Sequence, residues 1–342
     1  MSAQDSPQPS PETARVARHL SRRRRWRPIE IAFWLGLLAA IVLVPSRALL
    51  INEILILGLF ALSLDLALGY AGLVSLGHAA FLGIGAYAAG IAASAGLNDP
   101  FVGLAIGIGC AAVAGAISAP LLLRGSDLTR LMVTLGVSLM LGELANRSAW
   151  ITGGADGLSI SMRPVLGLFP IGFTGQRNAA LYSFAVLFVL FALARRLTQS
   201  NFGLSVQAVR QNRLRAGALG IPAAARLIAT YTISAAYAGA AGALLAQTTQ
   251  IVSLDVFDFH RSADTLLMLV IGGPGYLYGG LLGAALFVGL RDLISGATPE
   301  YWEFWIGLLL VALVTIGRER VAGWPSLALA RLGLGARRGA AP

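Results

Sequence analysis

Long apolar runs recur along the chain from Ile29 to Ile316, and short polar segments separate them. An α-helix needs about 20 apolar residues to cross the hydrocarbon core of a bilayer. The runs predict ten membrane-spanning helices, of which the eighth is short for a full crossing, at about 29–45, 49–67, 73–94, 101–123, 131–146, 178–194, 226–246, 262–272, 279–294 and 302–317. This pattern is typical of an all-α polytopic membrane protein.

The composition of the 342-residue chain supports this fold class. Hydrophobic residues make up 56% and charged residues only 12%, whereas soluble domains average roughly 25% charged residues. The mean hydropathy of +0.74 also excludes a disordered chain, because disordered segments are polar and charged. We expect a transmembrane domain at 29–317, without a large soluble domain, between basic tails at 1–28 and 318–342.

All 26 basic residues are arginines, and their distribution predicts the orientation of the chain. Ten spans place both termini and the loops 124–130 and 195–226 on one side, and these segments carry 20 of the 26 arginines. Because arginine is enriched on the cytoplasmic side of membranes, we expect both termini and the loop 195–226 in the cytoplasm. The loop 147–177 is then external. The same rule explains the N-terminal arginine cluster better than a nucleic-acid-binding patch does, so no nucleic-acid partner is expected.

The segment Gly69–Tyr87 combines helix-breaking glycines with polar side chains at membrane depth. A broken backbone persists there only where protein or a water-filled cavity satisfies its polar groups, and ionisable residues at that depth are functional candidates. We therefore expect a translocation path here, with the candidates Asp65, Gly72, Ser75, Gly77 and His78. The alternative for the histidine is a side chain that a neighbouring carbonyl satisfies and that locks helix packing.

The sequence carries no pattern of a catalytic or metal-binding site. No Ser-His-Asp order, His-x-x-x-His pair or cysteine cluster accompanies His78. The single cysteine, Cys110, lies in an apolar stretch, so we expect a free thiol in the core and no disulfide. We expect neither a metal nor a cofactor.

The segment Ser200–Pro222 in the predicted cytoplasmic loop has the signals of two short helices outside the membrane. The first helix fits Gly203–Gln211. Asn212 is a good N-cap for the second helix, and Gly220 followed by a proline ends it. One stripe of this second helix would carry Leu214, Ala218 and Leu219. Such a helix suits a groove on a partner protein, and the alternative is an amphipathic segment that rests on anionic lipid.

A third glycine-rich segment, Ile271–Gly280, must form a turn or a helix break. It is not a nucleotide-binding loop, because no strand precedes it and no lysine follows it. It shares the spacing G-x-x-G-x-x-x-x-G with Gly69, Gly72 and Gly77. In a chain with 41 glycines, we attribute the shared spacing to chance rather than to an internal repeat.

Four motifs follow one another in the order found in a known family: Gly69–Tyr87, Thr152–Leu158, Ala208–Ile221 and Gly272–Gly283. With these motifs, residues from about 29 to 317 resemble the permease subunits of bacterial branched-chain amino-acid ABC importers of the LivM type. The string Ser75–Phe81 is similar to the LivM-like half of the permease pair and not to LivH-like partners.

This resemblance implies a fold like that of type II ABC importer permeases, in the bacterial inner membrane. It implies a LivH-like second permease subunit, two cytoplasmic ATP-binding cassette subunits and a periplasmic substrate-binding protein as partners. ATP hydrolysis would belong to those partners, which fits the absence of a Walker A motif from the sequence. The resemblance also makes Ala208–Ile221 the ATPase-coupling segment, with the residues Ala208, Arg210, Asn212, Arg213, Leu214, Leu219 and Gly220.

Two external segments are expected to meet the binding protein. Thr152–Leu158 and the acidic segment Asp255–Asp264 suit a rim that must release its partner in each cycle, because they offer short polar side chains, with glycines in the first segment. The docking candidates are Thr152, Asp156, Asp255 and Asp258.

The substrate class remains open at this point. The chain departs from the family pattern at three places. Asp65 stands where the family commonly has asparagine, and Thr129 and Arg130 stand where an aromatic pair is common; these two departures lie near the predicted path. Gln211 stands where an acidic residue is usual. From the resemblance we expect a substrate in a broad range: a branched-chain or other hydrophobic amino acid, or a related small amide or carboxylate. One alternative function is a stand-alone secondary transporter, but this would not explain the two short cytoplasmic helices. The other is a membrane-integral enzyme, whose candidate catalytic residues Asp65, His78 and Glu143 are scattered along the sequence.

Overall fold

The computed structural model describes residues 27–123, 125, 127–164 and 175–316. Apart from Arg27 and Pro28, the predicted basic tails at 1–28 and 318–342 lie outside the described residues. Parts of the predicted loops 124–130 and 147–177 also lie outside them.

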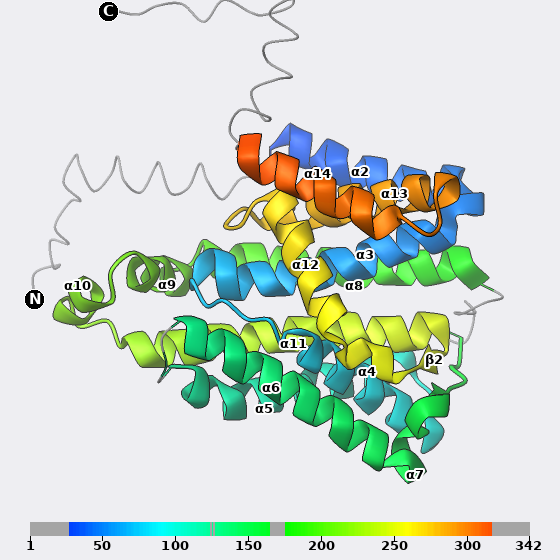
Figure 1. Ribbon diagram of the computed structural model, residues 1–342, viewed down its shortest axis with the longest axis horizontal. Coiled ribbons are helices and arrows are strands. Elements are labelled where there is room, and N and C mark those ends of the chain that lie inside the picture. Colours follow the sequence, from blue (N-terminus) through cyan, green and yellow to red (C-terminus); the bar gives the residue numbers. More distant parts are fainter. Residues whose placement is uncertain (1–26, 124, 126, 165–174, 317–342) are drawn as a thin grey trace, which may run out of the picture.

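Each of the ten predicted spans coincides with a helix (Figure 1). These helices are α2 (Pro28–Leu43), α3 (Ala48–Leu64), α4 (Ala79–Ser94), α5 (Pro100–Leu123), α6 (Asp127–Arg147), α8 (Gln176–Thr198), α11 (Ala223–Thr249), α12 (Phe259–Gly272), α13 (Leu277–Ala297) and α14 (Trp302–Ile316). Shorter elements connect them: η1 (Pro45–Arg47), η2 (Asp65–Tyr70), α7 (Ala149–Thr152), η3 (Gly154–Asp156), β1 (Leu158–Ser159), α9 (Asn201–Gln211), α10 (Arg213–Ala218), β2 (Ile251–Val252) and η5 (Leu254–Phe257).

Six helical stretches within the described residues have the length and apolarity of a membrane span. They are Pro45–Tyr70, Pro100–Leu123, Leu128–Arg147, Gln176–Thr198, Ala223–Thr249 and Leu277–Gly296. Helices α2 and α4 are apolar but shorter. Helix α12 has 14 residues, or about 21 Å at 1.5 Å per residue, which is less than the roughly 30 Å of a bilayer core. The multi-pass character is therefore clear, and the number of ten crossings stays a prediction.

Helix α11 forms the centre of the main core, where α3, α4 and α5 pack against it (Figure 1). Small residues let these helices approach closely. A Cβ atom added at Gly85 of α4 would overlap the backbone of Gly239 of α11, and one added at Gly242 would overlap the carbonyl group of Leu82. The glycines at these crossings therefore serve tight helix packing.

A second apolar cluster joins α3 to the later helices. Its buried members are Leu57 and Ala61 of α3, Met268 of α12, Ala284, Phe287 and Val288 of α13, and Ile306 of α14. Helix α3 belongs to both clusters, so it links the two parts of the bundle.

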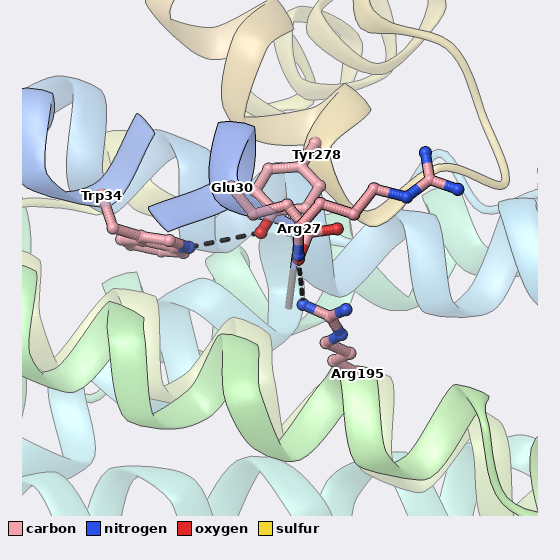
Figure 2. A network of polar contacts seen from close by, with 5 residues as sticks. All are labelled: Arg27, Glu30, Trp34, Arg195 and Tyr278. Carbon is pink, nitrogen blue, oxygen red and sulfur yellow. Dashed lines mark hydrogen bonds and ion pairs between the residues drawn. The ribbon is translucent and has the colours of Figure 1, made fainter. Parts of the chain in front are cut away.

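A network of polar contacts holds the first helix, α2, against the bundle (Figure 2). The guanidinium group of Arg195 on α8 forms an ion pair with Glu30 of α2, and both side chains are largely buried. The indole Nε1 of Trp34 donates to the hydroxyl of Tyr278 on α13 at 3.3 Å, and the indole packs edge-on against Phe191 of α8. The network therefore joins α2, α8 and α13.

The two long loops lie at opposite ends of the helix bundle. Figure 1 shows α9 and α10 at one end, and α7 and β2 at the other. Strand β1 pairs with β2 in antiparallel register, with Leu158 opposite Val252 and Ser159 opposite Ile251. The separation of the loops agrees with the parity of the predicted spans, while the end that faces the cytoplasm stays a prediction.

The prediction that Cys110 is a core thiol is wrong, because this free cysteine is exposed on α5. One side of α5 packs on α11, through Gly107 and Gly115, and much of the rest of the helix is exposed. A membrane helix is apolar on all sides. An apolar stretch therefore does not show which of its side chains are buried.

Candidate functional site

The first glycine-rich segment contains a wide helical turn followed by a break. Helix α3 continues into the π-helix η2 (Asp65–Tyr70), the chain is not helical at 71–78, and α4 begins at Ala79. The amide of Leu73 donates to the carbonyl of Ala67 at 2.9 Å, which closes the last turn. Gly72 has a φ of +70°, in the left-handed region that favours glycine. Single π-turns are frequent at functional sites.

The second break is the turn between α12 and α13. Gly273 and Gly275 have φ values of +98° and +87°, so both need the conformational freedom of glycine. A Cβ atom at Gly272 would overlap the carbonyl oxygen of Gly279, and one at Gly283 would overlap that of Met268. The two helices therefore diverge from a close backbone contact at this turn.

The two breaks meet at the buried side chain of Asp65. The amide of Gly275 donates to Asp65 Oδ1 at 2.6 Å. A Cβ atom at Gly69 would overlap both this carboxylate and the Gly275 nitrogen, so only glycine fits between them. The second oxygen, Oδ2, has no hydrogen-bond partner within the described part of the chain. Asp65 therefore joins two segments that are more than 200 residues apart.

Helix α9 reaches the same junction through Arg210. Its guanidinium group donates to the carbonyl oxygen of Gly69, and its alkyl chain covers Gly72, where an added Cβ would lie 3.1 Å from Arg210 Cγ. Arg210 thus has a contact within this chain, and its expected contact with a partner stays a prediction. We call the group Asp65, Gly69, Gly72, Arg210 and Gly275 the glycine junction.

The two predicted short helices of the coupling segment are present, the first beginning at Asn201 instead of Gly203, and the second with the predicted N-cap. Ser200 caps α9, and Asn212 Oδ1 accepts from the Arg215 amide at 3.0 Å at the start of α10. Gly220, with a φ of +78°, follows the end of α10. Ala208 is half-buried and Arg213 is exposed.

Two leucines are exposed at α10, Leu214 on the helix and Leu219 directly after its end. Leu214 is 88% exposed and Leu219 is 75% exposed, whereas Ala216 between them is buried. Val206 and Val209 anchor α9 in the main core. The segment is therefore a fixed platform that presents two apolar side chains at one end of the bundle.

His78 is a buried cross-link between helices. Its Nε2 atom lies 3.0 Å from Ser63 Oγ of α3 and 3.3 Å from Ser234 Oγ of α11. Both hydroxyl groups donate to carbonyls, those of Phe60 and Ser63, so Nε2 carries the proton and donates to them. The packing alternative considered for His78 therefore fits, with serine hydroxyls in place of a carbonyl.

Two further path candidates are also buried inside the subunit. A Cβ atom at Gly77 would overlap the carbonyl of Thr134 on α6, and the Leu76 amide donates to Thr134 Oγ1 at 3.2 Å. Ser75 is almost fully buried. The segment after the first break is thus held against α6.

The external candidates come together at the opposite end. The β1–β2 pair brings Asp156 of η3 and Asp255 of η5 to the same end of the molecule, and both are exposed. Asp258 is exposed and caps α12, where it accepts from the His260 amide at 3.2 Å. Thr152 is buried and donates to the carbonyl of Ala145 at 2.6 Å, so its hydroxyl has a structural contact.

Comparison with known proteins assigns the family. The model of the family described as "Branched-chain amino acid transport system / permease component" matches residues 46–314. The chain belongs to this permease family. Membership in this family agrees with the resemblance found in the sequence and makes the chain a multi-pass membrane transport component. The alternative of a membrane-integral enzyme is therefore set aside.

Curated relatives of this permease carry two kinds of name. It is 30% identical over 286 residues to the high-affinity branched-chain amino acid transport system permease protein LivM of Salmonella typhimurium, and 30% over 288 residues to LivM of Escherichia coli; each match covers 75% of this chain and 65% of the relative. It is also 28% identical over 253 residues to the autoinducer 2 import system permease protein LsrC of an Enterobacter species, with 70% of each chain covered. No solved structure matches the permease.

Sequence reasoning missed the contacts that assemble the glycine junction. The three motifs that meet at this junction were each visible, but nothing in them indicated that Arg210 reaches Gly69 or that Asp65 binds Gly275. The one available signal was the charge of Asp65 four residues before Gly69, since the segment around Gly275 carries no charged residue. In the described residues no group of three histidine, cysteine or acidic side chains is placed to hold a metal ion.

Proposed function

We propose that this chain is the transmembrane permease subunit of an ABC importer, with ten crossings and both termini in the cytoplasm. The observation that carries the proposal is the α9–α10 platform, with Leu214 and Leu219 exposed at the end of the bundle. Isolated exposed leucines on a capped, anchored helix suit an apolar groove on another protein. The acidic β1–β2 end lies opposite (Figure 1) and suits a partner that delivers substrate.

The glycine junction supports a role for α9 in coupling. An ATPase that moves the α9–α10 platform would pull on Gly69 through Arg210, and the same displacement would reach α13 through Asp65 and Gly275. A short rigid helix transmits such a motion, because its ends are fixed by capping and packing. The complete assembly would contain a LivH-like permease, two ATP-binding cassette subunits and a periplasmic binding protein.

The proposed substrates are branched-chain or other hydrophobic amino acids, or a related small amide or carboxylate. The names of the two LivM relatives support the branched-chain amino acids in this range, whereas the name of the LsrC relative points to import of a different small molecule. The test is uptake into proteoliposomes that contain this chain with the ATPase and permease from its gene neighbourhood, plus the loaded binding protein. Uptake that requires internal ATP supports the proposal. Uptake that needs only an ion gradient would show a secondary transporter instead.

We expect labelling of single cysteines to show the orientation. In a Cys110→Ala background, a cysteine at Gly217 of α10 should react with an impermeant thiol reagent only in inverted vesicles, and one at Asp156 only from outside in spheroplasts. The reason is the arginine bias of the loops. Both sites are exposed, and Gly217 has open space around an added Cβ. Labelling of the Gly217 site from outside would reverse the proposed topology.

We expect charge reversal at the acidic end to weaken docking of the binding protein. Asp156→Arg and Asp255→Arg should slow its association several-fold at low salt, since rim charges act mainly on the association rate, and assembly should be unchanged. Asp258→Asn removes the charge of the third acidic candidate but keeps an N-cap oxygen for α12, so it should also slow association while the helix is retained. Surface plasmon resonance on the reconstituted complex measures the rate. Unchanged association in both reversed variants would refute docking at this end.

A further inference from the structure

A groove of about 540 Å³ lies between α5 and α8. Both helices contact α11, and Tyr182 of α8 joins them at one end of the groove, where its hydroxyl donates to the carbonyl of Pro100 at 3.3 Å. The Tyr182 ring also packs edge-on against Phe101 of α5. Of the ten lining residues, Asn178 and Tyr182 carry polar groups and the other eight are apolar. None of the sequence motifs pointed to this surface.

The groove has the length of one leaflet of a bilayer. Both helices have the length and apolarity of a membrane span, and the lining residues of α8 run from Asn178 to Leu190. These positions are 12 residues apart, or about 18 Å at 1.5 Å per residue, and half of a bilayer core is about 15 Å thick. Asn178 lies in the first turn of α8, and α9 follows the last turn. The groove therefore runs from the end that carries the β1–β2 pair toward the middle of the membrane.

The side chains of the groove suit a hydrocarbon chain better than another helix. Helix contacts within membranes are enriched in small residues, and α5 uses Gly107 and Gly115 where it packs on α11. In the groove only Ala185 is small, and the other apolar residues are leucine, isoleucine, valine and phenylalanine. Branched and aromatic side chains keep the backbone of a neighbouring helix at a distance, whereas a flexible acyl chain can fill the space between them. Among the described residues, none of those that line the groove is charged, so nothing there matches the charges of an ionic solute.

Basic groups gather at the outer mouth of the groove. Arg177 is exposed in the first turn of α8, and Arg163 is exposed beside the start of α5, where its amide donates to the carbonyl of Asn98 at 3.1 Å. Neither arginine forms an ion pair with a carboxylate in the described stretches of the chain. Asp99 is the acidic residue at this mouth, and its Oδ1 accepts from the Phe101 amide at 2.8 Å. Two arginines against one acid, together with the N-terminus of α8, favour an anion here.

We propose that this groove binds an anionic phospholipid. One acyl chain would lie along the groove from Tyr182 to Leu190, and Arg177 and Arg163 would bind the phosphate group. In the proposed orientation this lipid belongs to the outer leaflet. The inference does not depend on what the permease transports. It gives α8, whose last turn leads into the α9–α10 platform, a lipid contact that holds it beside α5.

Photocrosslinking of the full chain in lipid nanodiscs tests this site. A phosphatidylglycerol with a diazirine in one acyl chain is added at low mole fraction to phosphatidylcholine nanodiscs, and mass spectrometry identifies the crosslinked peptides. Crosslinks are expected at 101–108 and 178–190, above the level at Val113, Ile117 and Leu121, which form an exposed reference face of α5. Unlabelled phosphatidylglycerol should displace the labelled lipid from the groove. Diacylglycerol with the same acyl chains lacks the phosphate and should need at least about fivefold higher concentration, which is the effect of one arginine near a membrane surface.

Matched variants separate the two parts of the site. Arg177→Gln should raise the displacing concentration of phosphatidylglycerol about fivefold, and Arg196→Gln, at an exposed arginine at the other end of α8, should leave it unchanged. Ala185→Trp fills the groove and should remove most crosslinks there. Leu193→Trp adds the same ring to α8 outside the groove and should not. Thermal unfolding shows whether each variant is folded, and Arg177→Gln changes only an exposed side chain.

Three results in the nanodiscs would each overturn the inference: groove crosslinks no stronger than those at the reference face, equal displacement by diacylglycerol, or an unaffected Arg177→Gln variant. The same labelling is then repeated in the assembled importer. Groove crosslinks that persist there support a bound lipid in the working complex. Their loss would show that a helix of a partner subunit covers the groove, and would overturn the inference as well.

Discussion

Replacing Leu219 with aspartate is expected to abolish both the co-purification of the ATPase subunit and the stimulation of its ATP hydrolysis. Leu219 is 75% exposed beside the end of α10, so the substitution should leave the fold of this chain intact. In the docked complex, however, an unpaired carboxylate would enter an apolar groove, which is costly. A loss of at least about 2 kcal/mol in binding free energy, or roughly 30-fold in affinity, is expected for a central contact.

Leu97→Asp provides the matched control for this experiment. Leu97 is 52% exposed and follows α4, at the end of the bundle opposite α10. The same charge placed there should leave ATPase binding unchanged. The loaded binding protein should still dock to the Leu219→Asp variant. If the ATPase co-purifies with this variant and is stimulated as in the parent, the α9–α10 platform is a lipid-facing linker and coupling occurs elsewhere.

Replacing Gly77 with leucine should strongly reduce transport even when the protein inserts into the membrane. A side chain at Gly77 would overlap the backbone carbonyl of Thr134 on α6, and backbone yields less readily than a flexible side chain. Overpacking in cores typically costs about 1–3 kcal/mol, and we expect the upper part of this range. The segment 71–78 would then move away from α6, and with it the chain that leads to the glycine junction.

Gly109→Leu on α5 is the control, because nothing lies within 4 Å of an added Cβ at that position. Thermal unfolding in detergent and uptake in proteoliposomes are measured for both variants. Gly77→Leu should lower both the midpoint of unfolding and the uptake, and Gly109→Leu should change unfolding little. Normal uptake by Gly77→Leu would show that the close approach to Thr134 has no part in transport.

Local signals predicted the elements of this structure well. The ten apolar runs each coincide with a helix, because helix formation in a membrane follows from the need to satisfy every backbone polar group internally. The two ends of α10 could also be predicted, because caps depend on local backbone contacts. Asn212 accepts a hydrogen bond from the backbone amide three residues further along, and Gly220 has a positive φ. These features depend only on neighbouring residues.

The sequence by itself determined the helices and their order along the chain. Only the tertiary structure decided that Asp65, Arg210 and Gly275 meet, that two serines bind His78, and that Cys110 is exposed. The physical reason is that a membrane helix is apolar toward lipid and toward its neighbours alike, so hydrophobicity does not mark its buried face. Which polar groups find one another then depends on helix packing between distant parts of the chain.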